Sequence, residues 1–192
     1  MMRLPFCTGV FLLAVYSCAS EKEPCPTAYT DRYNLTADQK DQVPYSGRDT
    51  MLFTSSAGDS VQVAGFGIDS TYDVQTNVQN NCDYGTRYYE KNTITFSDPA
   101  NKLYIKTSLN LYDVNTSYYT GGGLDINFQN VWFSCMLTDL NSQFYADTVV
   151  LSDGPHAALQ IMALDSSYLY YNTVEGILKC ELHNGKTWHL KR

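Results

Sequence analysis

The six cysteines are the side chains whose type and placement could carry chemistry in this chain. Cys18 stands at a boundary, because an apolar run ends just before it and the polar stretch ASEKEP follows. Only Arg3 is charged ahead of Cys18, and the run is shorter than the about 20 residues that span a membrane. A charge followed by a short apolar run is typical of a secretory leader. The pattern therefore predicts a signal peptide over residues 1–17.

The end of this leader, Val15-Tyr16-Ser17-Cys18, resembles the lipobox of bacterial lipoproteins. The resemblance implies cleavage before Cys18 and a lipid on the Cys18 sulfur, which would anchor the chain because each buried methylene contributes about 0.8 kcal/mol. Residues 18–33 would then be the lipidated cysteine with its tether, and residues 34–192 an all-β domain. The alternative is a plain signal peptide with an incidental cysteine.

The residues after Cys18 bear on where such a lipoprotein would go. By similarity to lipoprotein sorting, Ala19 in place of an aspartate implies transport to the outer membrane. Glu21 and Glu23 look like part of the acidic surface-export signal of Bacteroidota lipoproteins. We therefore expect a cell-envelope location, with the domain facing the periplasm or the cell surface.

Four further cysteines remain after Cys7 leaves with the leader: Cys25, Cys82, Cys135 and Cys180. An even number in an exported chain favours disulfides, with three possible pairings. Cys25 and Cys82 lie among Pro, Asn and Asp, whereas Cys135 and Cys180 lie on apolar strand faces, so like environments predict Cys25–Cys82 and Cys135–Cys180. The second pair could instead be two free, buried thiols. The sequence contains no CxxC spacing, so a zinc site built from the four cysteines is not expected.

The histidines and acids form no recognisable catalytic motif. HExxH and GxSxG are both missing from the sequence, so we predict no catalytic residue, no metal site and no cofactor. His183 and His189 flank the Asn184-Gly185 turn and could form a metal pair, but two solvated hairpin residues are the favoured interpretation. His156 follows a turn and is expected to be exposed.

Two further patterns suggest chemistry at the surface. Asp139 and Asp147 could be imagined as glycosidase carboxylates, although sequence does not set their separation. Four triplets resemble the O-glycosylation acceptor of exported Bacteroidota proteins. The alternative is chance recurrence in a chain rich in Asp, Ser and Thr. The acceptor hydroxyls would be those of Thr50, Ser60, Ser70 and Thr148.

Composition limits the partners and the fold class. The formal net charge is −7, which disfavours nucleic acid and anionic lipid surfaces as partners. The 16 tyrosines, with many Thr, Val and Phe, favour pleated, half-buried strands. We expect most of the tyrosines simply to occupy strand positions. The more specific alternative is that some of them form a flat, tyrosine-lined surface that binds carbohydrate.

The elements that must position these residues are mostly strands. Thr36 and Gln39 form a capping-box pattern before Pro44, which predicts a short helix over 36–42. The run KLYIKTSLNLYDV alternates apolar and polar residues, which predicts a half-buried antiparallel strand. The apolar phase reverses at Gln129-Asn130, where we expect a bulge. Asn184-Gly185 predicts a two-residue hairpin turn. Further strands are expected at 50–55, 59–66, 69–78, 84–97, 124–128, 131–135, 159–163 and 178–182.

These elements predict a single antiparallel β-sandwich or barrel-like domain of about nine or ten strands with one short N-terminal helix. The chain resembles a group of small Bacteroidota lipoproteins in the segments CPT at 25–27, TDRYNLTADQKDQVPYSGRDTMLF and EGILKCELHNGKTWHL. The resemblance carries no enzymatic signature. The leading hypothesis is a non-enzymatic, lipid-anchored outer-membrane or surface domain that binds a glycan or protein partner. The alternatives are a small-ligand carrier with a barrel cavity, or a hydrolase without a recognisable motif.

Overall fold

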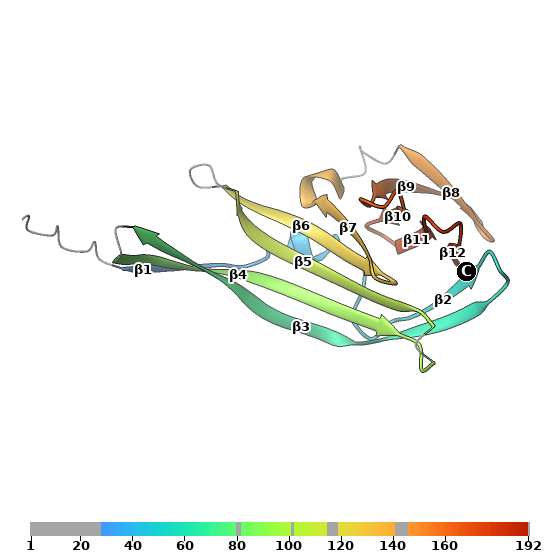
Figure 1. Ribbon diagram of the computed structural model, residues 1–192, viewed down its shortest axis with the longest axis horizontal. Helices are drawn as coiled ribbons and strands as arrows, with labels where there is room; N and C mark the ends of the chain where they lie inside the picture. The colour runs from blue at the N-terminus through green and yellow to red at the C-terminus, as the bar shows by residue number, and fades with distance from the viewer. Residues whose placement is uncertain (1–27, 80–81, 101, 115–118, 141–145, 192) are drawn as a thin grey trace, which may run out of the picture.

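The computed structural model describes residues 28–79, 82–100, 102–114, 119–140 and 146–191, and it is built almost entirely of strands. Eleven antiparallel strands form one continuous sheet that curls into a half-barrel, and β1 adds to it in parallel beside β4 (Figure 1). The predicted all-β class is confirmed. The predicted count of nine or ten is wrong, because the described residues contain twelve strands.

The elements follow one another in the order of the chain. They are β1 (Tyr29–Tyr33), α1 (Ala37–Lys40), β2 (Thr50–Ser55), β3 (Ser60–Gln79), β4 (Cys82–Ser97), β5 (Tyr104–Val114), β6 (Tyr119–Phe128), β7 (Val131–Met136), η1 (Leu137–Leu140), β8 (Asp147–Leu151), β9 (Gly154–Met162), β10 (Tyr168–Asn172), β11 (Gly176–Glu181) and β12 (Thr187–Leu190). In space the sheet runs β7-β6-β5-β4-β3-β2-β12-β11-β10-β9-β8. Neither helix is long or apolar enough to cross a membrane.

The concave side of the curled sheet holds the core. The pairing of β2 with β12 joins the β3–β7 half to the β8–β11 half. The rings of Phe53 and Phe128 meet edge to face with centroids 5.9 Å apart, which links β2 to β6 across the interior. Burying each side chain of this kind contributes about 1.5–3 kcal/mol. Other large, fully buried side chains are Trp188, Tyr171, Phe96, Phe133 and Leu103.

Strand β5 confirms the alternation that its sequence predicts. Leu103, Ile105, Leu109 and Leu111 are buried on the concave face, and Thr107 between them is 1% exposed. A period of two places these residues on one face. On the opposite face Tyr104 is 38% exposed, but Ser108 and Asn110 are buried as well, so only the first part of the strand is half-buried as predicted.

The reversal of phase at Gln129-Asn130 has a different cause from the expected bulge. Both residues have positive φ, +49° and +68°, and Phe128 pairs with Val131. This is a two-residue hairpin turn between β6 and β7, in which φ > 0 at both central residues matches the twist of the strands. The apolar phase changes because the chain doubles back, not because a residue is inserted.

The predicted two-residue turn at Asn184-Gly185 is also wrong by one residue. The Leu182 N–H donates to the Lys186 oxygen at 2.9 Å, so the loop contains His183, Asn184 and Gly185. Gly185 takes φ of +82°, which is the left-handed residue that closes a three-residue hairpin.

Two strands are much longer than their partners and form an arm. The expected strands at 59–66 and 69–78 are one strand, β3, with a register shift between Gly65 and Ile68. Strand β2 pairs only with residues 60–64 of β3, and β5 only with residues 91–97 of β4. The remaining lengths of β3 and β4 extend beyond the half-barrel with β1 as a third strand (Figure 1). We call these parts of β1, β3 and β4 the arm.

A strap, residues 34–49, crosses the concave side between the two halves of the sheet. Its α1 begins with the predicted capping box, since Thr36 and Gln39 exchange hydrogen bonds, so the helix prediction is confirmed. The Tyr171 hydroxyl donates to the Gln42 carbonyl oxygen at 2.8 Å. The Ile177 N–H donates to the Tyr45 hydroxyl oxygen at 2.7 Å. The strap is therefore bonded directly to β10 and β11.

We expect Tyr45→Phe to lower the free energy of unfolding by about 1–3 kcal/mol, because the buried Ile177 N–H loses its acceptor. Urea unfolding of both proteins measures the difference. Tyr104→Phe is the matched control, since Tyr104 is 38% exposed and its change should stay within about 0.5 kcal/mol. Equal effects of the two substitutions would contradict the role of the strap.

Candidate functional site

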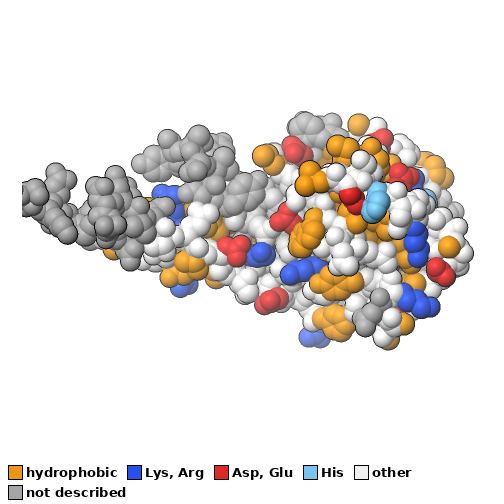
Figure 2. All heavy atoms as spheres, viewed as in Figure 1, with side chains coloured by type: hydrophobic (Ala, Val, Ile, Leu, Met, Phe, Trp, Pro, Cys, Tyr) orange, Lys and Arg blue, Asp and Glu red, His pale blue; other side chains and the backbone are white. Residues whose placement is uncertain are grey.

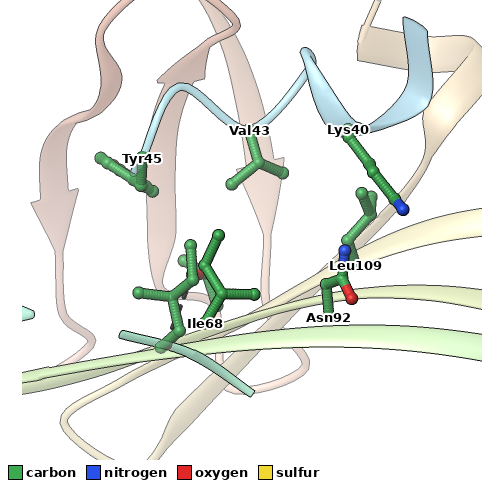
Figure 3. Close-up of a pocket in the computed structure, with 8 residues that line it drawn as sticks. Lys40, Val43, Tyr45, Ile68, Asn92 and Leu109 are labelled. Atoms are coloured by element: carbon green, nitrogen blue, oxygen red, sulfur yellow. Dashed lines mark hydrogen bonds between the residues drawn. The ribbon is translucent and has the colours of Figure 1, made fainter. Parts of the chain in front are cut away.

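A small apolar hollow lies where the arm leaves the body, and we call it the junction hollow. Val43 and Tyr45 project from the strap toward Ile68 on β3, with Leu109 and Asn92 on the neighbouring strands (Figure 3). Its volume is about 90 Å³, whereas ligand pockets usually measure roughly 300–1,000 Å³. The junction hollow can therefore take a single aliphatic side chain but not a drug-sized ligand. Its full lining is Lys40, Val43, Tyr45, Ile68, Asn92, Ile94, Thr107 and Leu109.

Glu90 on β4 is a buried carboxylate that is paired with Lys40, one of the residues lining the hollow. Lys40 Nζ lies 2.8 Å from Glu90 Oε1, and the Leu35 N–H donates to Glu90 Oε2 at 2.9 Å. The side chain of Glu90 is 10% exposed. A buried charge needs such partners, so Glu90 serves to hold the strap against β4 and is not a free base.

Aromatic and cationic side chains fasten β1 to the arm. The guanidinium carbon of Arg32 lies 5.6 Å from the ring centroid of Tyr72 and 5.4 Å from that of Tyr88. The Tyr72 hydroxyl donates to Asn34 Oδ1 at 2.7 Å. Cation–π contacts of this kind contribute about 0.5–1 kcal/mol each at exposed sites.

His156 is held by two carboxylates, a group we call the His156 clamp. Its Nε2 lies 2.8 Å from Asp153 Oδ1 and its Nδ1 lies 2.8 Å from Glu175 Oε2. The hydrogen bond with Asp153, together with Glu175, raises the pKa of His156 above its usual value. The side chain is 16% exposed, so the expectation of an exposed residue is wrong. Both ring nitrogens are engaged, which leaves neither available as a catalytic base.

The other two histidines do not form the metal pair that we weighed. His183 Nδ1 lies 2.8 Å from Asp165 Oδ2. His189 faces Lys179 on β11, and burial, followed by the charge of Lys179, lowers its pKa. Within the described ranges, no three His, Cys, Asp or Glu side chains lie together in a way that could hold a metal ion.

The predicted Cys135–Cys180 disulfide is wrong, because both residues are free thiols. Cys135 pairs with Leu124 on β6 at one edge of the sheet, whereas Cys180 lies inside the other half beside Trp188. Burial raises the pKa of Cys135 to about 12, with smaller contributions from Asp139 and Asp125. Burial raises the pKa of Cys180 as well. Neither is a thiolate at neutral pH, so neither has the reactivity of a nucleophile.

The remaining predicted site residues fall in three places. Cys18 and Cys25 lie outside the described residues, and Cys82 begins β4 with its side chain outside the description, so the Cys25–Cys82 bridge stays a prediction. Asp139 lines a groove of about 390 Å³ beside β7, while Asp147 begins β8 and does not line that groove. The four hydroxyl residues are all exposed, as glycosylation would require, and their modification stays a prediction. They are Thr50, Ser60, Ser70 and Thr148.

Comparison of the chain with protein-family models, curated proteins and solved structures finds no match. The features that sequence analysis missed are the junction hollow and the His156 clamp. Asn172 and Glu175 do carry a local signal, because the Asn172 side chain accepts the Glu175 N–H in a tight turn. The sequence gives no sign that His156, 19 residues earlier, meets Glu175.

We expect the His156 clamp to make stability depend on pH. Because the pKa of folded His156 is raised, its contribution is present below the unfolded value of about 6.5 and is lost as pH rises through the folded pKa. Urea midpoints of wild type and His156→Gln should therefore differ most near pH 5.5 and converge toward pH 9. A difference that grows with pH would contradict this assignment.

We also expect Cys135 and Cys180 to be unreactive thiols in the folded protein. Iodoacetamide should alkylate them at pH 8 only after unfolding in urea, without any reductant, because burial keeps both protonated. Mass spectrometry of the digested protein locates the label. A cross-linked Cys135–Cys180 peptide in the unreduced digest would contradict the structure.

Proposed function

We propose that the protein is a non-enzymatic, lipid-anchored β-domain of the outer membrane, which its arm holds away from the bilayer and which binds a partner in the cell envelope or at the cell surface. The observation that carries this proposal is the direction of β1. Strand β1 runs parallel to β4, with Tyr29 beside Gly85 and Tyr33 beside Tyr89. Tyr29, the first residue of β1, therefore lies toward the end of the arm that is farthest from the half-barrel (Figure 1).

Contacts along β1 make this attachment firm. The Tyr29 ring packs on the backbone of Gly85 and leaves no room there for a Cβ. Arg87 lies 5.8 Å from the Tyr29 ring centroid, and the Tyr33 and Tyr89 rings stack with centroids 5.1 Å apart. A force applied to the chain at Tyr29 would therefore be carried by β1 and by the two strands that it contacts, β3 and β4.

The length of the arm sets the distance between anchor and body. From Gly85 to Lys91, where pairing with β5 begins, β4 advances about 20 Å at about 3.3 Å per residue. A lipid on Cys18 would place the far end of the arm near the bilayer and the half-barrel beyond it. Acidic, basic and apolar side chains are interspersed on the face of the body shown in Figure 2. Such a mixed surface fits a soluble domain on a spacer better than one lying flat on anionic lipid.

Binding is favoured over catalysis by what the reactive side chains already do. His156 is engaged by two carboxylates, Glu90 is paired with Lys40, and the Cys135 thiol is protonated. The junction hollow, at about 90 Å³, is too small for the ligand of the carrier alternative. The larger groove of about 390 Å³ lies between the edge strand β7 and β9 and not inside a closed barrel.

We expect Cys18→Ala to abolish labelling of the protein by radioactive palmitate in the producing bacterium, because the acylated sulfur is removed. Mass spectrometry of the purified native protein should show an acylated first residue that corresponds to Cys18. Cys25→Ala is the matched control and should keep its label. Undiminished labelling of Cys18→Ala, or an unmodified residue at the start of the native chain, would reject the anchor.

A further inference from the structure

We propose that the unpaired edge of β3, from Ile68 to Thr76, binds an extended segment of a partner protein that adds to the sheet as an antiparallel strand, with apolar and basic side chains alternating along it. This site is a property of the folded domain. It goes beyond the anchor and does not depend on it.

The edge becomes free at a defined point. Strand β2 pairs with β3 up to Ala64, and the strap continues this pairing through two bonds, Gly65 N–H to the Asp49 oxygen at 2.9 Å and Gly67 N–H to the Gly47 oxygen at 2.7 Å. The chain upstream of Gly47 then turns across the concave side as the strap. Beyond Gly67, no described residue pairs with this edge of β3, which borders the arm in Figure 1.

This edge lacks lysine, proline and a bulge, and its only charged side chains are the two aspartates, Asp69 and Asp73. Exposed edges are normally short, bulged, or blocked by lysine or proline. Strand β3 contains no Lys, Arg or Pro from Ser60 to Gln79, and its register with β4 is uninterrupted from Ile68 to Asn77. Free backbone N–H and C=O groups in such a row are the donors and acceptors that strand addition uses.

The two faces of the edge differ in chemistry. Ile68 and Val74 share one face and are 51% and 55% exposed. Tyr72 lies on the same face and is 40% exposed, with its ring beside Arg32 and its hydroxyl bonded to Asn34. Asp69 and Asp73 share the other face and are exposed. A strand laid beside β3 would place its apolar side chains next to the first set and its basic side chains next to the two carboxylates.

The junction hollow adds a place for a single side chain. Ile68, the first residue of the free edge, forms part of its wall together with Val43 and Ile94. Its volume of about 90 Å³ suits one aliphatic side chain of the incoming strand at the end nearest the body. Backbone pairing would then supply affinity, and this position together with the two aspartates would supply selectivity.

Charge selects a basic partner over a second copy of this chain. The whole chain carries a formal charge of −7, and two copies meeting through this edge would bring Asp69 and Asp73 of each into one interface. Like charges across paired strands are destabilising. Lys91 Nζ lies 3.6 Å from Asp73 Oδ2. The Asp73 side chain is nevertheless 59% exposed, so a basic side chain of the partner can still reach its carboxylate.

The probe is a fluorescent synthetic peptide that alternates Val with Lys or Thr and is about as long as the free edge, added to the purified full-length protein in detergent. Fluorescence anisotropy measures binding, and hydrogen exchange with mass spectrometry locates it. We expect saturable binding with slower exchange confined to residues 68–76. A peptide of the same pattern with Glu in place of Lys is the control and should bind at least tenfold more weakly.

Two variants of the protein test the faces separately. Val74→Lys should weaken binding at least tenfold, whereas Val174→Lys, at an 80% exposed turn residue, should leave it unchanged. The double variant Asp69→Asn with Asp73→Asn should weaken binding about two- to tenfold at low salt, and this difference should vanish in about 1 M salt. Circular dichroism confirms that each variant is folded. Absence of binding, protection elsewhere in the sheet, equal binding by Val74→Lys, or occupation of this edge by a second copy of the chain would each overturn the proposal.

Discussion

The structure depends on the covering of one concave sheet face by the strap. A sheet that closes only half of a barrel leaves polar groups on its concave side without hydrogen-bond partners from the sheet itself. Such groups cost free energy when they are buried and unpaired. The strap meets this need on both halves, because Tyr45 and Gln42 bond to β11 and β10 while Leu35 and Lys40 bond to Glu90 on β4. The strap thereby connects strands that are far apart in sequence and stabilises the curl of the sheet.

The arm follows from the same arrangement. The sheet is stabilised where both of its faces or edges have partners, and β2 and β5 end their pairing with β3 and β4 well before those strands end. Strand β1 restores pairing on one side of the arm, through backbone register and the Arg32, Tyr72 and Tyr88 contacts. The other side has no such partner among the described residues, because the strap leaves β3 at Gly47 in order to cross the core. One element cannot both cover the concave side and continue along the edge.

The charged and reactive side chains serve the architecture. The contact between His156 and Glu175 joins two neighbouring turns. The Asp98 carboxylate accepts the Leu103 and Ala100 N–H groups just before β5. Burial alone would raise the pKa of Asp98, but these hydrogen bonds hold it below its usual value. Such bonds fix the conformation of the turns between the strands. A sheet with exposed loops and an open edge offers surfaces for recognition, which agrees with the proposed binding function.

The sequence by itself determined the features that depend on neighbouring residues. Alternation in β5 and the Thr36–Gln39 capping box predicted their elements correctly, because period-two facing and cap bonding act within one segment. Tertiary structure decided the rest. Similar apolar surroundings did not bring Cys135 and Cys180 together, because the curl of the sheet places them in different halves. Three other features arise where segments distant in sequence meet or separate: the His156 clamp, the junction hollow and the free edge of β3. Local sequence patterns cannot predict them, because such patterns carry no information about which distant segments become neighbours.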